Sequence, residues 1–278
     1  MAVIALTSAK GSPGVTTTVL ALASAWPWVE AGRRVLVVDA DVSGGDIAPG
    51  YLRGATAPGS GLVALAASRP AAIVDRLWDH LVSLDEAGTR LLLTGVTDPG
   101  QARSLAGLWP HIGQLLSELC GEDPGLDVLV DLGRLGAAGE AEALRTSADL
   151  VALVTRSSLR ATTTARGAAR RLSEERTASS SKGNVACVVV GEGRPYGAAE
   201  MSTAIGLPIL TTMSWDPASA EVLSEGAPAS WRFARSALMR SAGVAAKLLR
   251  EAAHDEGRGP APDAMITPRQ DARVGVTS

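Results

Sequence analysis

The stretch Thr7–Ala23, TSAKGSPGVTTTVLALA, decides the fold. It follows a short apolar strand over Ala2–Thr7 and leads into an apolar helix, which is the setting that a phosphate-binding loop requires. Gly11 and Gly14 allow the backbone to wrap an anion with its N–H groups, and the helix N-terminus adds a partial positive charge. The stretch therefore predicts a phosphate site. The alternative is an ordinary Gly-Ser-Pro-Gly turn before a helix.

Two later segments have aspartates at the ends of apolar strands or just after them. The segment VLVVDADVSGGDIAP has Asp39 at the end of a strand and Asp41 two residues later, and LDVLVDLG ends a strand in Asp131. Ligands bind at the carboxyl ends of strands in open α/β sheets, and a single Asp after an apolar strand typically holds Mg²⁺ through water. The segments predict a magnesium–phosphate site shared with the Thr16 hydroxyl. The alternative is that one of Asp39 and Asp41 only caps the next turn.

In this order the motifs resemble those of the ParA/MinD family of P-loop ATPases, whose deviant Walker A loop reads roughly K-G-G-x-G-K-[ST]-T. The matching residues are Lys10, Gly11, Gly14, Thr16 and Thr17. Ser12 replaces a glycine, and Val15 replaces the general P-loop lysine. The resemblance extends through ADLVALVT and GLPILTTMSWD to about residue 250. Gly191 stands where many ATP-binding members have an asparagine that reads the adenine, so base specificity is open.

The resemblance implies a role for each matching residue. Lys10 corresponds to the signature lysine that reaches a partner's nucleotide, and Asp41 to the carboxylate that orders the attacking water, so these are the expected catalytic residues. Asp131, through water, and Thr16 are the expected magnesium ligands. The expected ATP contacts are Asp39 and the loop residues Gly11, Ser12, Gly14, Val15, Thr16 and Thr17.

The function that this resemblance implies is an ATP- and Mg²⁺-dependent homodimerisation switch. Such a protein positions a cargo through a protein partner: a chromosome or plasmid, division machinery, or a pilus or secretion assembly. The pilus-associated branch includes degenerate members. Because Val15 supplies no charge, we expect weak ATP hydrolysis. The alternative is a pseudo-ATPase scaffold with little or no turnover. A metabolic P-loop enzyme of the amidoligase type is a third class, but no additional substrate domain is indicated.

Composition narrows the class of protein. Of the 278 residues, 46% are hydrophobic and 20% charged, as in globular proteins, and the net charge of −3 does not indicate a globally basic nucleic-acid binder. Two cysteines make no disulfide framework, the N-terminus does not read as a signal peptide, and no apolar run approaches the roughly 20 residues of a membrane span. We therefore expect a cytoplasmic protein. The three scattered histidines predict no zinc site.

Apolar strand-like runs alternate with helical patterns, which predicts a single doubly wound α/β domain with a mostly parallel sheet. We expect this nucleotide-binding domain over residues 1–255 and a disordered C-terminal tail over 256–278. The expected strands are Ala2–Thr7, Arg34–Val38, Arg90–Thr94, Val128–Val130, Leu150–Val154, Asn184–Val190 and Ile209–Met213. The expected helices are Thr16–Ala31, Leu62–Ala66, Ala71–Leu77, Gln101–Leu119, Gly139–Arg145, Thr162–Arg176, Ala198–Ala204, Ala218–Glu225 and Ser236–His254.

Two basic segments have alternative interpretations. The arginines between Arg156 and Arg176 predict either a solvated helix face or a surface for nonspecific DNA or an acidic partner. Trp231–Arg250 is basic and amphipathic, so it predicts either a last helix packed on the sheet or a membrane-binding helix such as MinD carries. We favour the solvated face and the packed helix.

Overall fold

An eight-stranded sheet lies at the centre of the molecule. The structure, a computed structural model, describes residues 2–10, 13–56, 59–67, 73–123, 125–136, 141–179 and 183–255. The strand order is β3-β4-β2-β5-β1-β6-β7-β8, and every neighbouring pair is parallel except β3 with β4. The strands are β1 (Val3–Ser8), β2 (Arg34–Asp39), β3 (Val82–Ser83), β4 (Arg90–Leu93), β5 (Leu126–Arg134), β6 (Leu150–Arg156), β7 (Asn184–Val190) and β8 (Ile209–Met213). The predicted fold class is confirmed.

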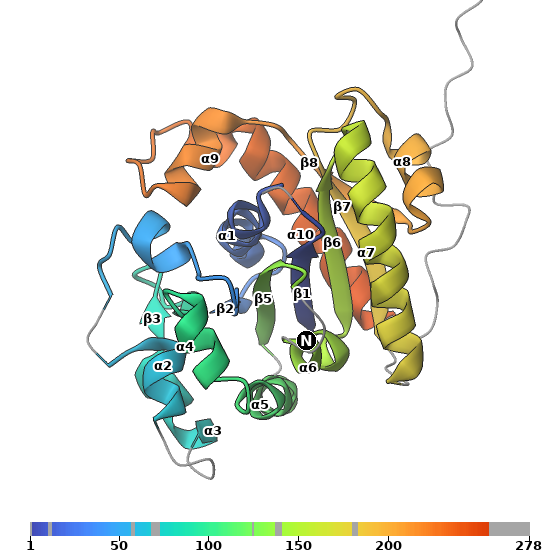
Figure 1. Cartoon of the computed structure of the whole chain (residues 1–278). Coiled ribbons are helices and arrows are strands. Elements are labelled where there is room, and N and C mark those ends of the chain that lie inside the picture. The colour runs from blue at the N-terminus through green and yellow to red at the C-terminus, as the bar shows by residue number, and fades with distance from the viewer. Residues whose placement is uncertain are drawn as a thin grey trace, which may run out of the picture.

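Helices cover both faces of this sheet, and Figure 1 shows α1, α9 and α10 in the upper part of the view and α4, α5 and α6 in the lower part. The helices are α1 (Val15–Ala25), α2 (Gly61–Ala66), α3 (Ile73–Arg76), α4 (Pro99–Ser104), α5 (Trp109–Glu122), α6 (Glu142–Ser147), α7 (Leu159–Ala178), α8 (Ala198–Ile205), α9 (Pro217–Ser224) and α10 (Ala237–His254). Strands buried on both faces explain the nearly continuous apolar runs in the sequence.

Two apolar layers result from the alternation of side chains along each strand. In β1, Val3 and Ala5 belong to the core that includes α5 and α7, whereas Ile4 and Leu6 belong to the core that includes α1 and α10. Trp26 closes the second core at the end of α1, and its buried indole Nε1 donates to Asp127 Oδ2 at 2.9 Å. The sheet is therefore a rigid base for residues at its carboxyl edge.

Some predicted elements were wrong in their boundaries. The expected helix Gln101–Leu119 is two helices, α4 and α5, because Pro110 is accommodated only in the first turn of a helix and so starts a new one. The first helix ends at Ala25 and not at Ala31, since Pro27 converts the next residues to a 3₁₀ turn. The two-residue edge strand β3 was not predicted, because so short a run carries no readable pattern.

The apolar face of α10 is fully buried against α1 and β8, through Leu238, Ala242, Ala246 and Leu249 among others. The packed-helix interpretation of Trp231–Arg250 is therefore confirmed for the helical part, and this face is not available to a membrane. Among the residues that the structure describes, no helix has both the length and the apolar character needed to cross a bilayer. The tail predicted over 256–278 lies outside the described residues.

Candidate functional site

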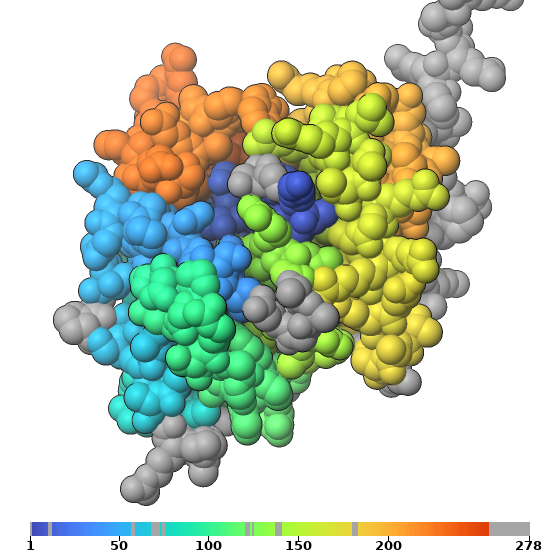
Figure 2. Space-filling view, in the orientation of Figure 1, coloured from blue at the N-terminus to red at the C-terminus, as the bar shows by residue number. Residues whose placement is uncertain are grey.

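Three neighbouring strands, β1, β2 and β5, bring the predicted residues to one edge of the sheet. Ser8 ends β1, and the register pairs Asp39 of β2 with Asp131 of β5. Because these strands are parallel, their following loops converge at the same edge. Figure 2 shows this edge as a hollow in the visible face, where dark blue N-terminal residues lie between light blue, orange and yellow-green segments.

A cavity of about 710 Å³ opens at this edge, in front of the N-terminus of α1. Gly14 adopts φ 93°, in the left-handed region that glycine enters without strain, and its carbonyl accepts from the Thr18 N–H at 2.8 Å. No acidic side chain lies in the first turn of α1. The free N–H groups of that turn therefore border the cavity with their partial positive charge, as anion binding requires. Gly11 and Ser12 lie outside the described residues.

Val15 begins α1 and lines this cavity with an apolar side chain. It is only 5% exposed and belongs to the core that includes Val19, Ile47 and Leu223. The first turn of α1 therefore offers backbone donors and the hydroxyls of Thr16 and Thr17, but no cation of its own.

Asp131 is buried beside Thr16. Its Oδ1 accepts from the Gly133 N–H at 2.9 Å, while Oδ2 has no partner among the described residues. Burial raises the pKa of Asp131 to about 6, the Thr16 hydroxyl opposes the rise, and the negative charges of Asp41 and Asp46 add to it. An unpaired carboxylate oxygen beside a threonine hydroxyl fits a Mg²⁺ held by Thr16 and, through water, by Asp131.

The described residues contain no group of three or more His, Cys, Asp or Glu side chains that could hold a metal ion. Mg²⁺ bound next to phosphates usually takes few ligands from the protein and keeps several waters.

Asp39 lies deeper than its predicted role requires. It is buried, both carboxylate oxygens lack partners among the described residues, and it does not line the cavity. A Cβ on Gly45 would lie 2.0 Å from Asp39 Oδ2, and one on Gly95 would lie 2.8 Å from its Cγ, so the carboxyl group sits between two glycines. Burial, and then the charge of Asp131, holds the pKa of Asp39 well above its ordinary value. Its contact with ATP stays a prediction.

Asp41 borders the cavity, as its predicted role requires. Its Oδ1 accepts from the Ser43 N–H at 2.8 Å, and its Oδ2 lies against Gly133, where a Cβ would come within 1.9 Å. Burial raises the pKa of Asp41, and the hydrogen bonds from Ser43 oppose the rise. The structure therefore brings Asp41, Asp131 and Thr16 together.

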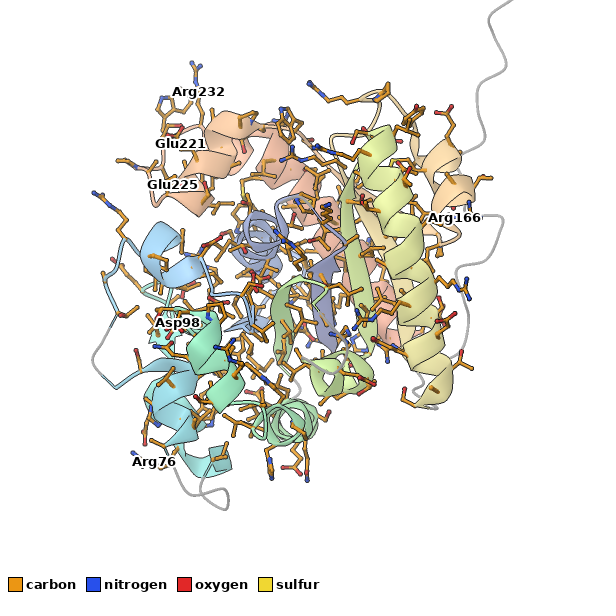
Figure 3. The ribbon with its side chains drawn as sticks, in the orientation of Figure 1. Arg76, Asp98, Arg166, Glu221, Glu225 and Arg232 are labelled. Carbon is orange, nitrogen blue, oxygen red and sulfur yellow. The ribbon has the colours of Figure 1, made fainter. Side chains whose placement is uncertain are left out.

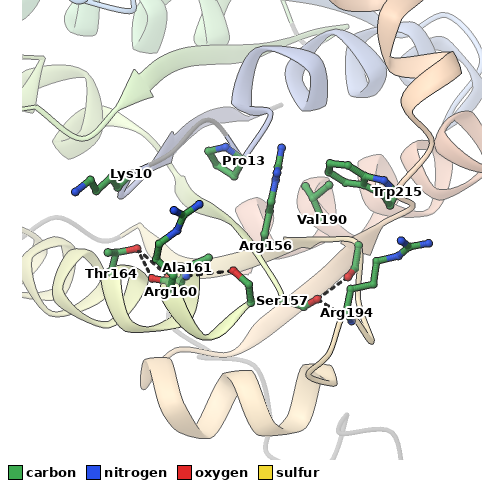
Figure 4. Close-up of a pocket in the computed structure, with 12 residues that line it drawn as sticks. Lys10, Pro13, Arg156, Ser157, Arg160, Ala161, Thr164, Val190, Arg194 and Trp215 are labelled. Atoms are coloured by element: carbon green, nitrogen blue, oxygen red, sulfur yellow. Dashed lines mark hydrogen bonds between the residues drawn. The ribbon is translucent and has the colours of Figure 1, made fainter.

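Lys10 lines a different cavity, of about 480 Å³, to which Pro13 also contributes (Figure 4). This second cavity is basic and aromatic: none of its lining residues is acidic, and it contains Arg156, Arg160, Arg194 and Trp215. Ser157 connects two segments that line this cavity. The Ser157 hydroxyl donates to the Gly191 carbonyl at 2.6 Å and accepts from the Arg194 N–H at 2.9 Å. The structure thus places Lys10 away from the phosphate loop's own cavity.

Sequence reasoning assigned no role at the phosphate site to Arg134 or Arg156, which both line the 710 Å³ cavity. Each is the last residue of its strand, β5 and β6 respectively. The strand-end rule that selected the aspartates could therefore have selected these arginines too.

The basic stretch on α7 is largely committed to the protein itself. Arg171 and Arg145 both pair with Glu175, Arg170 pairs with Glu174, and Arg176 donates from Nη2 to the Ala148 carbonyl at 2.8 Å. Figure 3 shows Arg166 on the outer side of α7, in the right-hand part of the view. These contacts leave fewer arginines for an outside partner than the sequence suggested.

The sequence matches no protein-family model and no curated protein. Solved structures do match. The septum site-determining protein MinD from Pyrococcus horikoshii, complexed with Mg-ADP, is 20% identical over 90% of this chain and 95% of its own, with a TM-score of 0.68. A ParA-family ATPase from Chlorobium tepidum is 17% identical over 88% and 98%, with a TM-score of 0.65.

The MinC–MinD cell division complex from Aquifex aeolicus matches at 16% identity over 90% of this chain and 95% of that chain, with a TM-score of 0.63. Each match spans nearly the whole length of both chains, although so few residues are identical. The chain therefore has the ParA/MinD fold, as its motifs predicted.

Proposed function

We propose that the chain is a nucleotide-dependent switch of the ParA/MinD kind, which binds ATP with Mg²⁺, dimerises and positions a cargo through a partner protein. One observation carries the proposal: the left-handed Gly14, the N-terminus of α1, Thr16 and Asp41 line one cavity, and the buried carboxylate of Asp131 lies beside Thr16. This arrangement of backbone donors and buried carboxylates suits a polyphosphate with a divalent cation.

In this proposal the chain's own groups have separate tasks. The N–H groups of the first turn of α1 would hold the phosphates, and the Thr16 hydroxyl and, through water, Asp131 would hold the cation. Asp41, fixed by the Ser43 N–H, orients a water at the cavity wall. Bound Mg²⁺ supplies charge neutralisation at the phosphates.

A positioning role and a partner follow from the likeness in fold. MinD from P. horikoshii is a septum site-determining protein that was solved with Mg-ADP, and the A. aeolicus protein was solved with MinC. We extend nucleotide binding, dimerisation and partner binding to this chain as parts of the proposal. The cargo is left open.

A specific observation favours a second function, that of a pseudo-ATPase scaffold. Val15 is buried at the position of the P-loop lysine, so the phosphate cavity lacks one preorganised cation. Losing one such donor costs roughly 10²–10³ in rate in well-studied sites. We expect ATPase activity near background, and at least a roughly tenfold gain in ATP affinity or hydrolysis in Val15→Lys. A folded Val15→Lys protein with neither gain would favour the scaffold.

Light scattering after size-exclusion chromatography tests the dimerisation switch. With MgATP the wild-type mass should double, and Lys10→Ala should stay monomeric because Lys10 is proposed to act across the dimer. Lys247→Ala is the matched control, since Lys247 is exposed on α10 at the opposite end of the chain. If ATP binds but the wild-type mass does not change, or if Lys10→Ala dimerises as well as wild type, the switch is wrong.

A further inference from the structure

The phosphate cavity has a shortage of positive charge. Its first-turn position is Val15, and its walls carry three acidic side chains, those of Asp41, Asp46 and Glu225. A nucleoside triphosphate adds several negative charges to this surface. Even with a divalent cation bound, a side-chain cation is needed near the terminal phosphates, because preorganised positive groups stabilise such charge most strongly in a water-poor site.

Two arginines line this cavity, and they differ in their surroundings. Arg134 ends β5, the strand of Asp131, and lies near enough to Asp41 for its charge to lower the pKa of that carboxyl group. Its charge is thus partly balanced within the protein. Arg156 ends β6 and also lines the cavity around Lys10, none of whose lining residues is acidic.

The sheet register places Arg156 beyond the end of β1. Arg156 ends β6, which pairs in parallel with β1, and Ser8 at the end of β1 is paired with Val154. The two residues after Val154 therefore extend past the start of the loop. Arg156 lines both the 710 Å³ and the 480 Å³ cavity, and Figure 4 shows its side chain standing between Pro13 and Val190.

Trp215 supports the side chain in this position. The guanidinium carbon of Arg156 lies 4.5 Å from the centre of the Trp215 ring. A guanidinium can stack on an aromatic face and also donate hydrogen bonds to phosphate oxygens from its planar edge. Gly191 leaves room for the indole, because a Cβ at this position would lie 3.3 Å from Trp215 Cβ.

We propose that Arg156 supplies from the end of β6 the positive charge at the terminal phosphates that Val15 does not supply from α1. The inference rests on the proposed function, because it assumes that the cavity takes a nucleoside triphosphate. It assigns to a strand end within the same subunit the task that a P-loop lysine performs from the loop. Arg156 is accordingly a phosphate-binding residue, and Trp215 is a positioning residue.

Calorimetric titration with MgATP tests this assignment without reference to turnover. Arg156→Ala should bind MgATP about ten to a hundred times more weakly than wild type, as expected for the loss of hydrogen bonds between charged groups. Arg156→Lys, which keeps the charge, should recover most of that affinity. Arg166→Ala is the matched control, because Arg166 is exposed on α7 and lines neither cavity. It should bind within about twofold of wild type.

A double variant, Arg156→Ala with Val15→Lys, tests whether the loss of MgATP affinity comes from the lost positive charge. If Arg156 replaces the lysine, Val15→Lys should restore MgATP affinity to Arg156→Ala. Should Val15→Lys not fold, because Val15 is buried, the recovery in Arg156→Lys carries the same information. Equal affinities of wild type and Arg156→Ala would overturn the assignment, and so would a loss that neither lysine restores. Wild-type protein that binds no MgATP would overturn the proposed function itself, and the assignment with it.

Discussion

Replacing Asp131 by asparagine should stabilise the protein in the absence of nucleotide and metal, and the gain should depend on pH. Burial raises the pKa of Asp131 from 3.8 to about 6, so the folded chain keeps a proton that the unfolded chain loses near pH 4. Between these values the folded state binds more protons, and the free energy of unfolding therefore falls as the pH rises.

The size of the effect follows from the pKa change. Each tenfold change in proton affinity corresponds to about 1.4 kcal/mol, so ionising Asp131 in the folded state costs about 3 kcal/mol above pH 7. Asparagine keeps an oxygen that can accept from the Gly133 N–H but carries no charge. Relative to wild type, Asp131→Asn should therefore gain about 2–3 kcal/mol between pH 4 and pH 7.

Urea denaturation of both proteins at several pH values between 4 and 7.5 measures this difference, with EDTA present and nucleotide absent. Asp79→Asn, at an exposed position, is the control for removing one negative charge. A difference between wild type and Asp131→Asn that stays constant over this pH range would refute the reasoning. So would a variant that becomes relatively less stable as the pH rises.

Three further substitutions test the geometry of the site and of the core. Gly133→Ala should weaken MgATP binding and cost about 1 kcal/mol or more in unfolding free energy, because φ is 55° there and the new Cβ would meet Asp41 Oδ2; calorimetry and urea denaturation check the two effects. Leu249→Ala should lower the unfolding free energy by about 2–5 kcal/mol, and a smaller loss would mean that α10 does not pack as described. Trp26→Phe should cost about 1–3 kcal/mol by removing the indole donor to buried Asp127, and a neutral result in denaturation would contradict the importance of that hydrogen bond.

The sequence was a good guide to the sheet because buried parallel strands produce apolar runs with few alternatives. The structure has β7 and β8 at the residues predicted for them, Asn184–Val190 and Ile209–Met213. The sequence was a weaker guide to helices in which a single residue interrupts the helical pattern. Pro110 divides one expected helix into two, and the effect of proline was not included in that prediction.

The candidate site was predictable to the extent that it depends on strand ends. Asp41, Asp131 and Thr16 meet at one edge as expected, because parallel strands direct their carboxyl ends to the same side. What could not be predicted depends on side-chain packing. The sequence does not show that Asp39 is enclosed between glycines or that the Arg156 guanidinium stacks on Trp215, since both require residues far apart in the chain.

We propose above that the cavity in front of α1 binds MgATP through the first turn of that helix. Calorimetric titration of wild type and Thr16→Ala with MgATP tests it most directly, because Thr16 lines the cavity beside Asp131. We expect one binding site per chain in the wild type and an affinity about tenfold or more lower in Thr16→Ala. Equal affinities, or no binding by wild-type protein, would contradict it.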